Sequence, residues 1–195
     1  MLNDLSSTLA LLETRRSGKP REMVAPGPSD AELDRILAIA ARTPDHAKLF
    51  PWRFVVVETG ERQALADLLA RALPLVDPDA GAAHHAKALE FAYQAPALVV
   101  LVSAPIAGHK IPLWEQELSV GAVAMTLLTA THAMGYVGGW ITGWMAYSAL
   151  VREAFCKPGE RIAGFMFLGS PGRPLEERPR PDMADIVRRW DGTTG

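Results

Sequence analysis

Apolar residues recur at two different spacings along the chain, and these spacings predict its helices and strands. Between Leu33 and Ala40 they fall three or four positions apart, which is the spacing of one helical face. The preceding sequence Ser29-Asp-Ala-Glu32 has the form of a capping box, in which each side chain binds the other residue's free backbone N–H. A helix is therefore predicted to begin after Ser29 and to end near Thr43, because Pro44 disfavours helical geometry in the residue before it.

Two runs rich in valine predict strands. The first, Arg53-Phe-Val-Val-Val-Glu58, is bounded by proline and glycine, and we expect a central strand there. The second, Ala97–Ser103, is continuously apolar and short, which favours a strand buried on both faces. Further strands are expected at 136–142 and 162–168, and further helices at 7–15, 61–73, 81–93, 112–134 and 148–155. This loose alternation of strands and helices is typical of an α/β or α+β sheet domain.

The segment from Leu118 to Gly138 is apolar or small almost throughout and approaches the length of a membrane span. It contains several threonines and His132, and it follows Glu115 and Glu117 without the basic anchors that flank spans. We therefore predict a buried helix and no membrane insertion.

Composition narrows the class of protein. With 195 residues, the chain is long enough to bury about 70% of its unfolded surface, and a single domain over residues 1–195 is expected. A net charge of −2 argues against binding to nucleic acid or to an acidic membrane. The single Cys rules out a disulfide framework, and the N-terminus has no basic residue before its apolar positions, as a signal peptide would. A cytoplasmic protein is expected.

The C-terminal region differs from the rest of the chain. Four of the 15 prolines lie between Pro171 and Pro181, so residues 174–195 are predicted to form an extended tail that packs on a partner subunit. Elsewhere there is no hydrolase motif, no Walker A loop and no Gly-x-Gly-x-x-Gly after a strand. The histidines and the cysteine lack the spacing of metal ligands, so no metal site is expected.

Arg15-Arg16-Ser17 is a candidate phosphate site, because two guanidinium groups and a hydroxyl can bind a phosphate through charge-assisted hydrogen bonds. The alternative is that the arginines only complement the negative end of a helix dipole.

Two later segments also have two interpretations. Arg42-Thr-Pro-Asp-His46 with Trp52 forms either a ligand rim or a capped turn beside a core tryptophan. Gly135-Tyr-Val-Gly-Gly-Trp-Ile-Thr142 is either a plain turn and strand or a place where a flat ligand approaches the backbone.

Six short motifs, taken in order along the sequence, resemble the nitroreductase family of FMN-dependent oxidoreductases, and in particular its compact YdjA-like branch. The motifs are Arg15-Arg16-Ser17, Arg42-Thr-Pro-Asp-His46 with Pro51-Trp52, Trp114-Glu-Gln-Glu-Leu-Ser119, Gly135-Tyr with Trp140, Val151-Arg-Glu-Ala-Phe155, and Gly164-Phe-Met-Phe-Leu-Gly169 with Pro171. Together they extend over residues 9–173.

The resemblance implies an α+β fold, with a central, mostly antiparallel sheet flanked by helices, in an interlocked homodimer that binds FMN at the subunit interface. One strand of the sheet would come from the partner's tail. It also implies the residues that contact FMN. Arg15, Arg16 and Ser17 would bind FMN, with the arginines at its phosphate, and Arg173 would be a second phosphate ligand. Arg42 and His46 would reach FMN from the opposite subunit. The flavin ring would be lined by Trp140, Ile141 and Thr142. Since the chemistry would take place at N5 of FMN, no side chain is named as catalytic.

The implied reaction passes electrons from NADPH or NADH to nitroaromatics, quinones or similar planar acceptors. Two positions depart from the family pattern: Phe50 stands where many members carry Gln, and Ile141 stands where this branch tends to carry a basic residue. If these two side chains block hydride access, they favour an alternative function, a flavin-binding carrier or sensor with little turnover. A dimeric scaffold that has lost FMN is a third possibility. Lys48 lies where other branches place an amide that touches the flavin, and is a further candidate.

Overall fold

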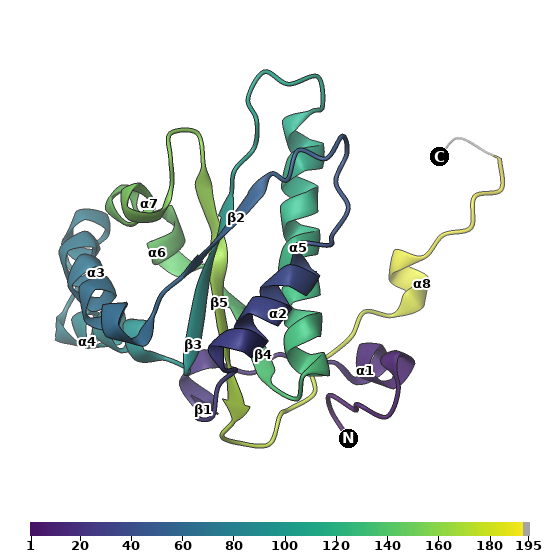
Figure 1. Ribbon diagram of the computed structural model, residues 1–195, viewed down its shortest axis with the longest axis horizontal. Helices are drawn as coiled ribbons and strands as arrows, with labels where there is room; N and C mark the ends of the chain where they lie inside the picture. The colour runs from purple at the N-terminus through teal and green to yellow at the C-terminus, as the bar shows by residue number, and fades with distance from the viewer. Residues whose placement is uncertain (193–195) are drawn as a thin grey trace.

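A computed structural model, described here for residues 1–192, shows a five-stranded antiparallel sheet with helices on both faces (Figure 1). The strands are β1 (Met23–Val24), β2 (Trp52–Val56), β3 (Ala97–Ser103), β4 (Val137–Ile141) and β5 (Arg161–Pro171). The α-helices are α1 (Thr8–Thr14), α2 (Asp30–Ala40), α3 (Arg62–Val76), α4 (Ala82–Tyr93), α5 (Leu113–Ala133), α6 (Gly143–Tyr147), α7 (Ala149–Phe155) and α8 (Met183–Ile186). Two 3-10 turns, η1 (Pro20–Glu22) and η2 (Thr59–Glu61), complete the elements. The predicted α+β class with an antiparallel sheet is confirmed.

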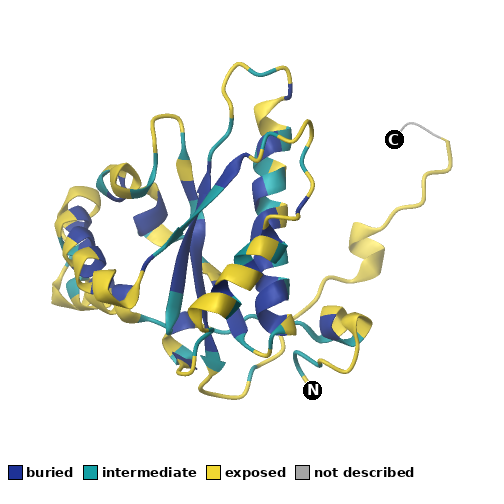
Figure 2. Ribbon diagram, in the orientation of Figure 1, coloured by how far each residue is buried: buried dark blue, intermediate teal, exposed yellow. Residues whose placement is uncertain are grey.

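Strands β3 and β5 form the centre of the sheet. β3 pairs with β2 on one side and β5 on the other, and β5 also pairs with β4 and, at its end, with β1. Both central strands are buried on both faces (Figure 2). Their side chains alternate between the two faces, as a strand requires. One face carries Leu98, Val100, Val102, Phe165 and Phe167, and the other carries Val99, Leu101, Met166 and Leu168.

Each face of the sheet is covered by its own set of helices. Helices α3, α4, α6 and α7 bury the first face, where Phe91 packs edge-on against Phe165 and Phe167. Helices α2 and α5 pack together over the second face. The predicted capping box starts α2, since the Ser29 and Glu32 side chains both accept from the other residue's backbone N–H. Gly135 ends α5 with a φ of +88°, a value that favours glycine.

Several predictions about the elements need correction. Within residues 1–192, β2 pairs with β3 alone, so it is an edge strand of this chain's sheet and not a central strand. Valine-rich sequences favour strands because their side chains pack well on the faces of a sheet. This holds for edge strands as well as central ones, so the composition of β2 does not distinguish the two positions. Helix α2 ends at Ala40, three residues before Thr43. Helix α3 continues through Pro74 to Val76, and the sequence did not predict β1 or α6.

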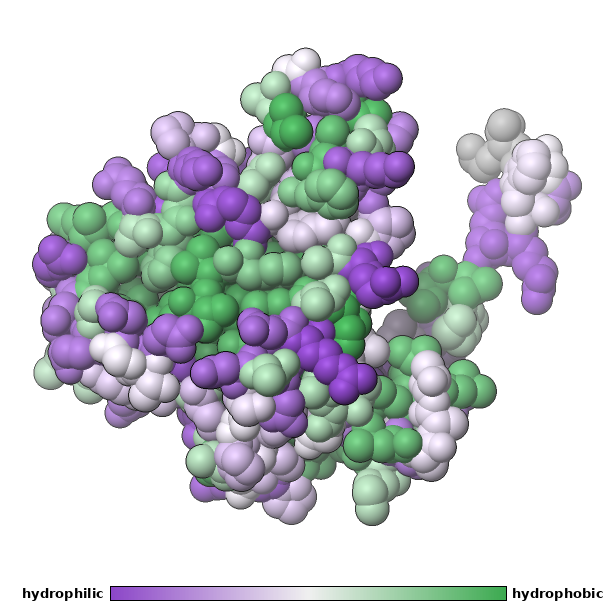
Figure 3. Space-filling view, viewed as in Figure 1, coloured by the Kyte–Doolittle hydropathy of each residue, from purple (hydrophilic) through white to green (hydrophobic). Residues whose placement is uncertain are grey.

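The region beyond Pro171 leaves the body of the molecule (Figure 1). Its described residues form no element before the short helix α8, which the prediction of an extended tail does not include. Residues 193–195 of the predicted tail lie outside the described residues. Figure 3 shows apolar groups on this tail, away from the core, where Met183, Ile186, Val187 and Trp190 are exposed. No helix among residues 1–192 has the length and apolar character needed to cross a membrane.

Candidate functional site

A cavity of about 520 Å³ lies between the segment after α1, helix α5 and strand β4. Arg15, Arg16, Ser17, Trp140 and Ile141 line this cavity, so the structure brings together five residues that the sequence places up to 126 positions apart. We call it the α5–β4 cavity.

The Arg15–Ser17 segment is held in place through its backbone. Asn3 brackets Arg16, with its Oδ1 accepting from Arg16 N at 2.7 Å and its Nδ2 donating to Arg16 O at 3.1 Å. Gly18 N then donates to Gly138 O at 3.1 Å, which ties the segment to β4. Sequence reasoning missed Asn3, although asparagine is one of the few residues that readily adopt its left-handed φ of +54°. The guanidinium groups therefore project from a fixed backbone.

The polar end of the cavity is strongly cationic. Arg15, Arg16, Lys19, Arg21 and Arg178 line it, and no acidic residue does. The Arg15 guanidinium also donates to Ser17 Oγ at 3.2 Å. Partial burial and the nearby positive charges, of Arg180, Arg16 and Arg178 in that order, lower the pKa of Arg15. Since an anion relieves this repulsion, the arrangement favours a ligand with a phosphate or carboxylate.

The side of the cavity formed by α5 and β4 is mainly apolar. Met125 and Leu128 from α5 lie there beside Trp140 and Ile141 from β4. Trp140 is 40% exposed, and its indole Nε1 donates to Ala163 O at 3.0 Å. Sequence analysis did not assign Met125 or Leu128 to the site, because their helical spacing indicates only a buried face. This side suits an aromatic ring system.

The glycines of β4 have a structural role, and Gly139 also lines the α5–β4 cavity. A Cβ on Gly138 would lie 2.6 Å from Leu128 Cδ2, and one on Gly139 would lie 2.8 Å from Gly18 O. The space beside both glycines is therefore filled by the protein itself. Close packing of α5 and the Arg15–Ser17 segment against β4 requires glycine at these two positions.

Two of the predicted residues lie next to the α5–β4 cavity and not in it. Arg173 lines a neighbouring cavity of about 370 Å³ together with Arg16, Ser17 and Lys19, so it lies on the other side of the same segment. Thr142 is half-buried and forms the N-cap position of α6, directly after Ile141.

Arg42 and His46 lie apart from this cavity within the chain. His46 Nδ1 is 2.7 Å from Glu115 Oε2 in the first turn of α5. The cavity reaches α5 first at Met125, ten residues further on, which is about 15 Å along a helix axis. Arg42, Lys48 and Phe50 are exposed and do not line it either.

The loop that carries His46 is shaped by Asp45. The Asp45 carboxylate accepts from Leu49 N at 2.9 Å and from Phe50 N at 2.5 Å, and Trp52 is buried in the core. The alternative of a capped turn beside a core tryptophan is thus correct for these two residues. Lys48 and Phe50 have φ values of +56° and +50°, which cost energy in non-glycine residues.

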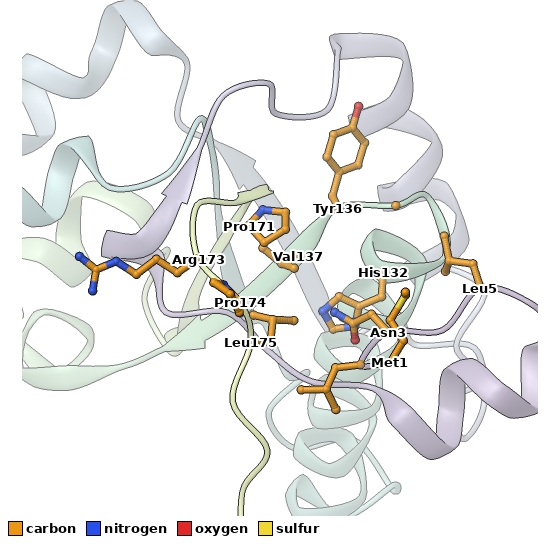
Figure 4. A pocket seen from close by; sticks show the side chains of 12 residues that line it. Met1, Asn3, Leu5, His132, Tyr136, Val137, Pro171, Arg173, Pro174 and Leu175 are labelled. Carbon is orange, nitrogen blue, oxygen red and sulfur yellow. The ribbon is translucent and has the colours of Figure 1, made fainter.

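A third cavity of about 400 Å³ lies behind β4, between the first residues of the chain, the end of α5 and the start of the tail (Figure 4). His132 lies in its wall and is fully buried. Its Nε2 accepts from Gly138 N at 3.2 Å, and burial, with a smaller effect of the Arg15 charge, lowers its pKa to about 4. His132 is therefore a neutral support of β4. Figure 4 shows the guanidinium of Arg173 pointing away from it.

The fold and the α5–β4 cavity together define the class: an α+β protein with a cavity lined by cationic and apolar side chains. The Nitroreductase family model matches residues 12–170, and the chain belongs to that family. YdjA of Escherichia coli (strain K12), named as an NAD(P)H nitroreductase, is 35% identical over 164 residues, which cover 84% of this chain and 87% of YdjA.

Solved structures share the fold. A nitroreductase-like family protein from Bacillus cereus superimposes with a TM-score of 0.80 at 19% identity, covering 96% of this chain and 97% of that one. The FMN- and NADPH-dependent nitroreductase NfnB from sphigopyxis sp. strain HMH superimposes with a TM-score of 0.72 at 21% identity, covering 96% of this chain and 100% of that one.

Proposed function

We propose that this chain is an FMN-dependent oxidoreductase that passes electrons from NADPH or NADH to nitroaromatic, quinone or similar planar acceptors. The observation that carries the proposal is the α5–β4 cavity, in which a cationic end adjoins a mainly apolar side. FMN has a phosphate and a planar ring system, and it matches both. Membership of the nitroreductase family and the name of the relative YdjA support the same activity.

The residues of the cavity fit FMN by charge and by shape. Arg15, Arg16 and Ser17 would hold the phosphate, with Arg173 approaching from the other side of the segment. Trp140, Ile141, Met125 and Leu128 would lie along the flavin ring. When bound, FMN supplies the hydride transfer chemistry at its N5. The side chains bind, orient and exclude water, and the positive charges favour a flavin that has gained electrons.

A homodimer completes this proposal. Arg42 and His46 would reach FMN from the partner, which accounts for their distance from the cavity of their own chain. The exposed apolar side chains favour such an assembly, since large exposed patches mark interaction sites. They include Leu9 and Leu12 of α1 and Trp114 and Leu118 of α5, besides those on the tail.

The proposed reaction is tested by the visible absorption spectrum of the purified protein, recorded before and after anaerobic addition of NADPH and, separately, NADH. A flavin band that bleaches supports the reductase. A band that neither nucleotide bleaches identifies a flavin-binding carrier or sensor instead. A protein without a band, even after addition of FMN, is a scaffold that has lost the cofactor.

The phosphate assignment is tested by charge reversal. Arg15→Glu and Arg16→Glu should each weaken FMN binding by about 100-fold or more, because each replaces a charge-assisted hydrogen bond with repulsion. Arg35→Glu is the matched control, since Arg35 is exposed on α2 outside the cavity. Equal FMN affinity in all three variants and in the wild type would return the two arginines to a helix-end role.

A further inference from the structure

The α5–β4 cavity carries more positive charge than FMN requires. The phosphate of FMN is a monoester with up to two negative charges at neutral pH. Arg15 and Arg16 are sufficient to neutralise it, and Lys19 already pairs with Glu22 at 3.5 Å. Two further guanidinium groups, those of Arg21 and Arg178, line the same cavity. Among residues 1–192, neither forms a salt bridge.

These two arginines come from different parts of the chain, and both line the α5–β4 cavity. Arg21 lies in η1, directly after the Arg15–Ser17 segment, and is exposed. Arg178 lies in the tail, where its neighbours are anchored on both sides. Glu176 O accepts from Arg16 Nε at 2.6 Å, and Arg180 Nη2 donates to Arg15 O at 3.3 Å. The tail therefore holds Arg178 at the cavity. The adjacent Glu177 carboxylate accepts from Arg178 N at 2.8 Å but pairs with the Arg180 side chain, so within residues 1–192 the Arg178 guanidinium has no salt bridge.

The surplus positive charge favours binding of a second anionic group besides the phosphate of FMN. The electron donors of the proposed reaction, NADPH and NADH, both contain a pyrophosphate, so a contact with that group does not distinguish them. They differ only in the 2′-phosphate of NADPH. Guanidinium groups bind phosphate through two parallel hydrogen bonds, and a pair of them fits a dianionic monoester.

We propose that Arg21 and Arg178 bind the 2′-phosphate of the nucleotide donor and thereby make NADPH the preferred donor over NADH. This inference rests on the proposed function, and it assigns to the proline-rich tail a part in substrate recognition. The tail contributes from the same chain, through the anchoring contacts of Glu176 and Arg180.

The test uses the FMN-loaded, full-length protein and two adenosine probes. Adenosine 2′,5′-bisphosphate carries the 2′-phosphate and adenosine 5′-monophosphate lacks it, and isothermal titration calorimetry measures the affinity of each. We expect the bisphosphate to bind at least about 10-fold more tightly to the wild type, as charge-assisted hydrogen bonds imply. Arg21→Gln and Arg178→Gln should each reduce this ratio, and the double variant should bring it close to one.

Arg188→Gln is the matched control, because Arg188 lies in the same tail but does not line the cavity. It should keep the wild-type ratio. The ratio of kcat/KM for NADPH to that for NADH is the second readout. This kinetic ratio should fall together with the ratio of probe affinities. A general loss of activity lowers kcat/KM for both nucleotides and therefore does not change their ratio.

Three binding results would overturn the inference: equal binding of the two probes by the wild type, an unchanged ratio in the double variant, or loss of FMN from Arg178→Gln, which would make Arg178 a ligand of FMN instead. A fourth comes from the reduction experiment. A flavin that NADPH and NADH bleach equally well would leave the proposed function standing while removing this inference. Failure of the proposed function itself is seen separately, as a flavin band that is absent or that neither nucleotide bleaches.

Discussion

The indole ring of Trp140 lies at the apolar side of the α5–β4 cavity because β5 leaves room for it. Its Nε1 donates to Ala163 O, and the next residue along β5 is Gly164. A Cβ on Gly164 would lie 2.0 Å from Trp140 Nε1 and 2.3 Å from its Cδ1. One missing methyl group on a neighbouring strand therefore sets the position of the residue that would contact the flavin.

Gly164→Ala should displace the Trp140 ring and break its hydrogen bond. We expect the free energy of unfolding to fall by about 1–3 kcal/mol, as for other overpacked sites, and FMN affinity to fall with it. Urea unfolding and an FMN titration measure the two effects. Gly60→Ala is the control, because a Cβ there meets nothing within 4 Å. If both variants unfold at the same urea concentration, Gly164 does not determine the position of Trp140.

His132 gives the fold a dependence on pH. Its pKa is about 4 in the folded chain and 6.5 for an ordinary histidine, so the unfolded state binds more protons between these values. Stability should therefore fall as the pH decreases from 6.5 to 4, by at most about 3 kcal/mol from this group. Urea unfolding at several pH values measures this. His132→Gln should flatten the profile, because glutamine supplies an acceptor for Gly138 N without titrating in this range.

His84→Gln is the comparison variant for this profile, since His84 is exposed on α4. It should keep the wild-type dependence on pH. A His132→Gln profile as steep as that of the wild type would mean that other groups, and not His132, cause the loss of stability in acid.

At the scale of elements, local sequence signals predict where helices start and end better than they predict which strands pair with each other. Ser29 and Glu32 form their capping box, and Gly135 ends α5, because each depends on a few adjacent residues. The position of β2 at the sheet edge depends on which strand pairs with which, and no pattern within the strand records that. β1, only two residues long, also exists only through its pairing with β5.

The capping box of α2 gives a direct test at this scale. Ser29→Ala removes the side-chain acceptor for Glu32 N and should lower the free energy of unfolding by about 1 kcal/mol. Ser29→Asp restores an acceptor and should recover most of the loss. Thermal or urea unfolding compares the three proteins. Equal stability of the alanine and aspartate variants would show that α2 depends on its packing against α5 and not on its cap.

At the scale of the whole molecule, one chain presents only part of the predicted site. The fold brings Arg15, Arg16, Ser17, Trp140 and Ile141 to one cavity, and a family resemblance alone had grouped these residues as contacts of one ligand. The sequence could not indicate Arg178, whose position depends on how the tail folds back on the Arg15–Ser17 segment. His46 lies beside Glu115 at the start of α5, and Arg42 does not line the cavity although the adjacent Thr43 bonds to Thr126 of α5, so their predicted role depends on a second chain.

The predicted homodimer can be tested by combining two defective variants. Each site would take Arg15 from one subunit and Arg42 from the other, so Arg15→Glu and Arg42→Glu should each lose FMN when prepared alone. Co-expression of the two should produce mixed dimers in which one site joins the two intact halves while the other carries both defects. With random pairing, half of the dimers are mixed and half of their sites are intact, so about a quarter of the wild-type FMN content should return.

Arg15→Glu combined with Arg16→Glu should recover none, because both changes affect the same half of the site. If native mass spectrometry shows mixed dimers but no FMN returns with Arg42→Glu, Arg42 does not act across the interface, and the cavity of a single chain must bind the cofactor without it.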